Sequence, residues 1–67
     1  MSRERDEKIL RQAENLARSG DFWSWWEIEV ELRSVGYQMA PELLDNERTR
    51  EHLDRMCAEA REMRLHP

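Results

Sequence analysis

The residues of this chain that could support catalysis or bind a metal are two histidines, His52 and His66, and one cysteine, Cys57. His52 and Cys57 are five positions apart, so they do not share a helix face, and no C-x-x-C or H-E-x-x-H spacing occurs. Cys57 falls on an apolar stripe, which is typical of a small core residue. We therefore expect no catalytic residue, no metal site and no cofactor.

The length of the chain also argues against an enzyme. It has 67 residues, and a core of that size supplies only about 3–5 kcal/mol of stability. Little of this remains to maintain a cleft with buried polar groups. We interpret residues 1–67 as one helical domain that is not an enzyme and has no small-molecule substrate.

The expected location of the protein is the cytoplasm. No apolar run approaches the roughly 18 residues of a membrane span. The mixed charges of residues 1–8 lead into no signal-peptide core, and a single cysteine excludes an internal disulfide.

The charge distribution does not favour nucleic acid as a partner. The net charge is −4, and residues 20–40 carry four acidic groups but one basic group, so no basic patch is predicted there. The acidic positions predict a solvated band or, alternatively, an acidic inhibitor that competes for a basic groove on a nucleic-acid-handling complex. This band comprises Asp21, Glu27 and Glu31, with Glu42 and Asp45 as further candidates.

The elements that must position these residues are all helical. Apolar periodicity predicts a compact three- to four-helix bundle, with helices at about residues 3–19, 25–35, 41–45 and 47–64. Ser2 is placed to begin the first helix and Gly20 to end it. The spacing leaves open whether residues 41–64 form one helix or two. The expected apolar stripes are Ile9, Leu10, Ala13, Leu16 and Ala17 in the first helix, and Leu53, Met56, Cys57, Ala60 and Met63 in the last.

Both ends of the second helix carry sequence signals. Ser24 and Glu27 have the spacing of a capping box, and Trp23 and Ile28 have that of a hydrophobic staple. At the other end Gly36 predicts a glycine stop, with Tyr37 placed to cover Leu32 as in a Schellman motif.

The second helix is predicted to be apolar on two faces. One face carries Trp25, Ile28, Leu32 and Val35, which we expect in the core, whereas Trp26 and Val30 lie nearly opposite, with Arg33 beside Trp26. Either this helix is central and covered on both faces, or its second face binds a partner or a second copy of the chain. The candidate partner-binding residues are Trp26, Val30 and Arg33, together with Glu27 and Glu31.

Two modes of nucleic-acid binding are weaker interpretations of this region. The tryptophan cluster could stack on bases, but its charged neighbours are acidic rather than basic. A dimeric helix-turn-helix-like DNA-binding regulator, with its turn at Gly36, remains an alternative. Against it, Leu32 stands where that motif has a small residue, and Glu42 and Asp45 stand where its second helix is apolar.

One pattern resembles that of a known group of proteins. It consists of Ser24-Trp25-Trp26-Glu27-Ile28-Glu29, Leu32-Arg33, Gly36-Tyr37, Leu44, Arg50, Leu53-Asp54 and Cys57. Over roughly residues 13–60 the chain resembles short, largely uncharacterised bacterial proteins of plasmids, integrative elements and prophages. The resemblance implies an accessory gene product of a mobile element, and it transfers no catalytic residue.

Taken together, these features predict a protein–protein interaction module that acts as an accessory or regulatory factor. Its partner is expected to be another protein or a second copy of the chain in a homodimer. Trp25→Ala is expected to unfold the domain, whereas Trp26→Ala should leave the fold intact and weaken binding.

Overall fold

The computed structural model describes residues 3–65, which form four helices without a strand. They are α1 (Arg3–Arg18), α2 (Trp25–Ser34), α3 (Ala40–Leu43) and α4 (Glu47–Leu65). The expected all-α bundle is confirmed. The region that sequence left open contains two helices, since the chain leaves helical geometry between Leu43 and Glu47. The predicted cap at Ser2 lies outside the described residues.

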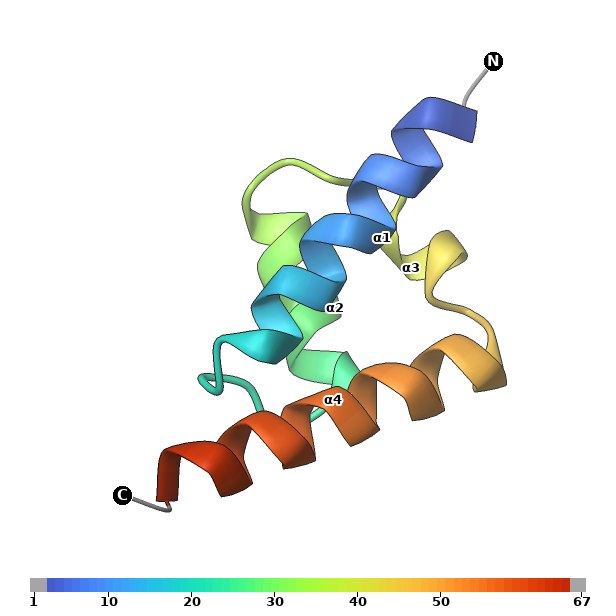
Figure 1. The fold of residues 1–67 in the computed structure, drawn as a ribbon. Coiled ribbons are helices and arrows are strands. Elements are labelled where there is room, and N and C mark those ends of the chain that lie inside the picture. Colours follow the sequence, from blue (N-terminus) through green and yellow to red (C-terminus); the bar gives the residue numbers. More distant parts are fainter. Residues whose placement is uncertain (1–2, 66–67) are drawn as a thin grey trace.

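The two long helices, α1 and α4, contact each other and make up most of the molecule's length. α2 packs against both of them, while short α3 lies against α1 and α2 (Figure 1). None of the helices described combines the length and the apolar character that a membrane crossing requires.

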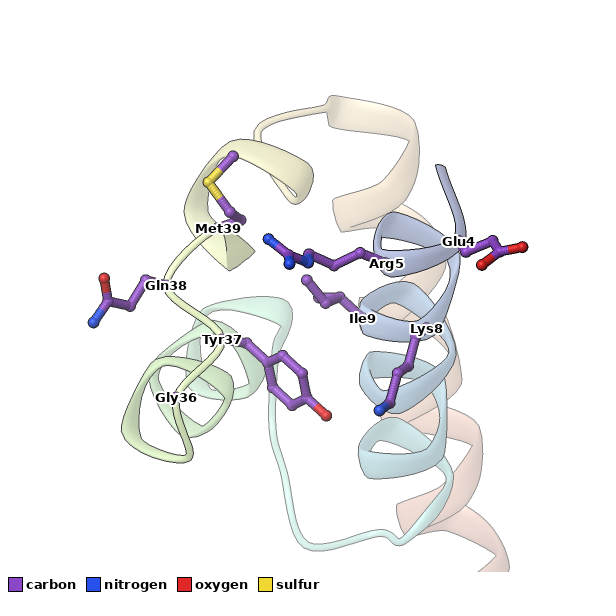
Figure 2. Close-up of a pocket in the computed structure, with 8 residues that line it drawn as sticks. All are labelled: Glu4, Arg5, Lys8, Ile9, Gly36, Tyr37, Gln38 and Met39. Atoms are coloured by element: carbon purple, nitrogen blue, oxygen red, sulfur yellow. The ribbon is translucent and has the colours of Figure 1, made fainter. Parts of the chain in front are cut away.

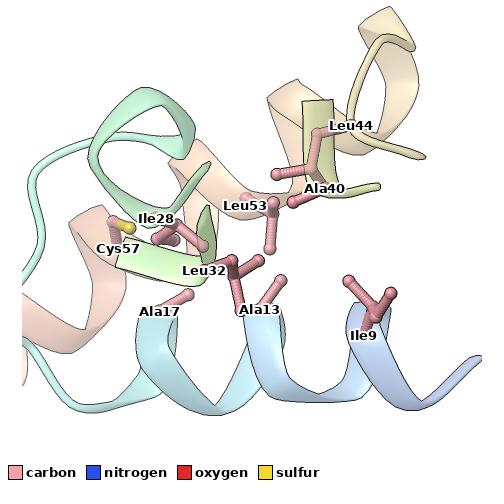
Figure 3. Close-up of a cluster of buried hydrophobic side chains, with 9 residues drawn as sticks. All are labelled: Ile9, Ala13, Ala17, Ile28, Leu32, Ala40, Leu44, Leu53 and Cys57. Atoms are coloured by element: carbon pink, nitrogen blue, oxygen red, sulfur yellow. The ribbon is translucent and has the colours of Figure 1, made fainter. Parts of the chain in front are cut away.

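The core lies where α1, α2 and α4 meet and extends to α3 (Figure 3). α2 contributes Ile28 and Leu32, which face the small side chains of Ala13 and Ala17 on α1 (Figure 3). Small residues at this contact let the two helix axes approach closely. The buried cluster consists of Ile9, Ala13, Ala17, Ile28, Leu32, Ala40, Leu44, Leu53 and Cys57.

The C-terminal end of α2 is the Schellman motif that the sequence predicted. The N–H of Tyr37 donates to the carbonyl of Leu32 over 2.9 Å, and the N–H of Gly36 donates to the carbonyl of Arg33 over 3.2 Å. Gly36 has φ +106°, a backbone conformation that favours glycine. The side chain of Tyr37 packs against the core cluster, as expected.

The N-terminal end of α2 differs from the prediction. Ser24 occupies the N-cap position, but its side chain makes no cap hydrogen bond. The carboxylate of Glu27 accepts from the N–H of Trp23, and that of Asp54 in α4 accepts from the N–H of Trp25 over 2.8 Å. The predicted capping box is therefore wrong. The Ser24 hydroxyl makes no cap bond, the Glu27 carboxylate accepts from Trp23 rather than from Ser24, and Asp54 of α4 binds the first N–H of α2.

Two of the three tryptophan rings each lie under the guanidinium of an arginine on α4. The guanidinium of Arg61 lies 4.1 Å above the ring of Trp23, and that of Arg50 lies 4.0 Å above the ring of Trp25. Trp23 remains 69% exposed, so it does not act as the predicted staple over Ile28. Its orientation depends on α4 instead.

Three further predictions about the core are wrong. Val35 is exposed because α2 ends at Ser34 and Val35 is already part of the turn. Met63 is exposed, six residues beyond the buried Cys57 on α4. α2 is not a central helix covered on both sides, since its buried residues lie on one face and Trp26 and Val30 are exposed on the other.

Candidate functional site: the outer face of α2

The outer face of α2 is the side of this helix that α1 and α4 leave uncovered. Trp26 is 60% exposed and Val30 is 46% exposed, and Arg33 is exposed as well. These residues follow the i, i+4, i+7 spacing of one helix face. Their exposure is a consequence of the core, because burying Ile28 and Leu32 turns the opposite side of a ten-residue helix to solvent.

A hollow of about 670 Å³ lies at the C-terminal end of this face. We call it the α2–α3 hollow, and its lining residues are Val30, Arg33, Ser34, Gln38 and Pro41. The hollow forms because the Schellman turn reverses the chain and places residues 38–41 beside the last turn of α2. Sequence analysis missed Ser34, Gln38 and Pro41 as site residues, although Gly36 signalled the turn that positions them.

A second hollow lies on the other side of the same turn. It has a volume of about 570 Å³ between α1 and residues 36–39, and Arg5, Lys8, Ile9 and Tyr37 are among its lining residues (Figure 2). The ring of Tyr37 points toward α1, whereas Gln38 points away from it (Figure 2). The turn therefore separates the α1 side of the molecule from the α2–α3 hollow.

Trp26 stands out because it lacks the contact that the other two tryptophans make. Trp23 and Trp25 each lie under an arginine, but within residues 3–65 no guanidinium lies over Trp26. The guanidinium of Arg33 makes no ion pair or hydrogen bond within the same residues. An aromatic ring and a guanidinium are thus both available at the surface of one helix.

Glu27 and Glu31 lie at the edge of the outer face. Both are half-buried, and the carboxylate of Glu27 is already bonded to the backbone of Trp23. Of the other acidic positions, Asp21 pairs with Arg64 at 2.7 Å and Asp45 pairs with Arg50 at 3.2 Å. Three carboxylates of the predicted acidic band are therefore engaged within the chain. This arrangement does not favour a free acidic surface that competes for a basic groove.

The region after α2 has neither the helix length nor the positive charge that binding in a DNA groove requires. α3 has four residues, about 6 Å of helix, whereas a recognition helix must reach along the bases of a major groove. Glu42, in α3, and Asp45, just after it, are exposed carboxylates. They would face phosphates of the same charge.

The residues with catalytic potential do not converge. The imidazole of His52 lies 3.1 Å from the carboxylate of Glu14 at the surface, while Cys57 is fully buried. Burial raises the pKa of the Cys57 thiol above 9.0, the carboxylates of Asp54 and Glu27 add to that rise, and Arg61 opposes it. Throughout residues 3–65 there is no group of three His, Cys, Asp or Glu side chains that could hold a metal. His66 lies outside the described residues.

The outer face has the composition of a protein-binding surface. Tryptophan and arginine are the side chains that most often anchor interfaces, and a hollow beside them offers room for a partner's side chain. Comparisons of the chain with family models, curated proteins and solved structures found no match.

Proposed function

We propose that this protein is a non-enzymatic protein–protein interaction module, which acts as a cytoplasmic accessory or regulatory factor of a mobile element. It binds its partner through the outer face of α2. The observation that carries this proposal is the 60% exposure of Trp26 on the same helix face as Val30 and Arg33.

The physical support is the free energy that a partner would gain by covering this face. Burying a tryptophan side chain removes about 150–250 Å² from water. Arg33 provides a charged group that can stack on an aromatic ring or bind a carboxylate of the partner. Neither residue is needed by the fold, since the core lies on the other side of α2.

The test compares two exposed apolar residues on different surfaces. Met63 is 76% exposed and lies on α4 in a separate hollow with Met56 and Arg18, so Met63→Ala is the matched control for Trp26→Ala. Tagged wild type and both variants are used to capture proteins from cell extract. Partners are identified by mass spectrometry, and direct binding is then measured with the purified partner.

We expect wild type and Met63→Ala to bind the same partner with equal affinity. Trp26→Ala should weaken that binding by at least about tenfold, as a hot-spot residue does, while its circular dichroism spectrum stays that of wild type. If Met63→Ala removes the partner and Trp26→Ala retains it, the binding surface lies on α4 and the proposal for α2 is wrong.

A further inference from the structure

We propose that the partner of this face is a second copy of the chain, packed antiparallel across a two-fold axis that passes close to Val30. In this dimer the Trp26 side chain of each copy enters the α2–α3 hollow of the other and stacks against its Arg33. The inference rests on the proposed function, because it uses the same outer face of α2.

The spacing along α2 makes the face self-complementary. Trp26 and Arg33 are seven residues apart, which is about two helical turns or 10 Å, so they point in nearly the same direction. A two-fold axis perpendicular to α2 at their midpoint, between Glu29 and Val30, places Trp26 opposite the partner's Arg33. The same operation places Val30 level with the partner's Glu29, so the two copies of Val30 lie only one residue, about 1.5 Å, apart along the helix direction.

The shape of the surface favours the same arrangement. The protruding ring of Trp26 lies at one end of the face, and the α2–α3 hollow lies at the other end, beside Arg33. One two-fold rotation therefore fills both hollows with both tryptophans and leaves no open site for a third copy. Such closed, isologous contacts are the commonest form of protein self-association.

Contacts within the chain provide a precedent for pairing Trp26 with the partner's Arg33. The chain already stacks an arginine over a tryptophan twice, at 4.0 Å and 4.1 Å. The antiparallel dimer would add the same contact for Trp26 with the partner's Arg33. Near the axis, the Glu29 carboxylate of each copy lies within reach of the partner's Arg33 guanidinium.

The contact area indicates the size class of this interface. Specific stable interfaces bury about 1,200–2,000 Å² in total. Two tryptophans supply roughly 300–500 Å² of this, and the rest of the face is one short helix with residues 38–41. We therefore expect an interface at the small end of that range and a dimer that dissociates on dilution.

Sedimentation equilibrium tests whether a second copy of the chain binds the outer face of α2. Wild type and Met63→Ala should pass from monomer to dimer with the same dissociation constant as protein rises from about 1 to about 500 μM. Trp26→Ala and Arg33→Ala should each raise that constant at least about tenfold. A wild type that stays monomeric over the whole range, or a Trp26→Ala variant that dimerises like wild type, would overturn the inference.

Mixing the two variants tests the orientation. A heterodimer of Trp26→Ala with Arg33→Ala keeps one intact contact between Trp26 and Arg33 and loses the other completely. Antiparallel packing therefore predicts more heterodimer than the statistical share, measured by native mass spectrometry with one isotope-labelled variant. Parallel packing pairs Trp26 with the partner's Trp26, so a purely statistical share would contradict the antiparallel geometry.

Cross-linking provides an independent measure of the axis. Val30→Cys should form a disulfide-linked dimer on oxidation, because the two copies of residue 30 meet near the axis. Arg11→Cys, at an exposed position of α1, should not. Native Cys57 is buried and does not compete. Equal cross-linking of both variants would mean random collision rather than a defined interface.

The experiments distinguish a failure of the homodimer from a failure of the proposed binding face on α2. If wild type is monomeric but captures a different protein that Trp26→Ala loses, the outer face of α2 binds that protein and the homodimer is wrong. If wild type is dimeric and neither Trp26→Ala nor Arg33→Ala affects dimer formation or capture, both proposals are wrong.

Discussion

The carboxylate of Asp54 accepts a hydrogen bond from the backbone N–H of Trp25, 29 positions earlier in the chain, over 2.8 Å. Trp25 is the first residue of α2, so this N–H has no acceptor within its own helix. A charged acceptor at a helix N-terminus also interacts favourably with the helix dipole. Asp54 thus caps α2 from α4 and fixes where the two helices meet.

Replacement of Asp54 tests this long-range cap. Asp54→Ala should lower the free energy of unfolding by about 1–2 kcal/mol, because it leaves a part-buried N–H without its acceptor. Ser24→Ala is the matched control, and it should change stability by less than about 0.5 kcal/mol, since the Ser24 hydroxyl makes no cap hydrogen bond. Urea unfolding followed by circular dichroism measures both. A larger loss in Ser24→Ala than in Asp54→Ala would show that the serine is the true cap.

Two adjacent tryptophans should differ sharply in their effect on folding. Trp25 is half-buried, packs against the core cluster and lies under Arg50, so Trp25→Ala should cost about 3 kcal/mol or more. Trp26→Ala should change the stability of the monomer by no more than about 0.5 kcal/mol. Thermal unfolding at a protein concentration well below the dissociation constant of the dimer, where dimers are few, separates these effects from self-association. If Trp26→Ala unfolds the monomer, its side chain belongs to the core and the proposed binding face is wrong.

Arg61 should be sensitive to replacement by lysine. Its Nη1 donates to the carbonyls of Phe22 and Trp23, at 3.1 Å each, while its guanidinium stacks on the ring of Trp23. A lysine does not combine these contacts, because it lacks a planar group with several fixed donors. We expect Arg61→Lys to lower stability by about 1 kcal/mol and to change the fluorescence of Trp23. Arg55→Lys, at an exposed position of the same helix, is the control and should behave like wild type.

Cys57 should make stability depend on pH in the alkaline range. Burial raises the pKa of its thiol above the 9.0 of an exposed cysteine, so the folded state holds this proton more tightly than the unfolded state does. The resulting stability is fully present below pH 9.0 and is lost as the pH rises from there through the higher pKa of the folded state. Urea unfolding of wild type and Cys57→Ala at pH 7 to 10 checks this, since the variant starts less stable but should lack this part of the pH dependence. Rapid reaction of native Cys57 with a thiol reagent at pH 8 would contradict its burial.

The sequence by itself determined the helices, the Schellman end of α2 at Gly36 and most of the core. These features follow from local rules, because helical periodicity and glycine stops depend on residues within a few positions of one another. For the candidate site, the same periodicity placed Trp26, Val30 and Arg33 on one face, but it did not tell whether another helix covers that face.

Only the tertiary structure decided that the face is open. It also placed Asp54 at the start of α2, Arg50 and Arg61 over two tryptophans, and residues 38–41 beside Arg33 to form the α2–α3 hollow. Each of these contacts joins different segments of the chain, so it depends on the crossing of α2 and α4 or on the fold of the turn after α2. The physical reason is that periodicity specifies which residues share a side of a helix, whereas burial depends on which other helix lies against that side.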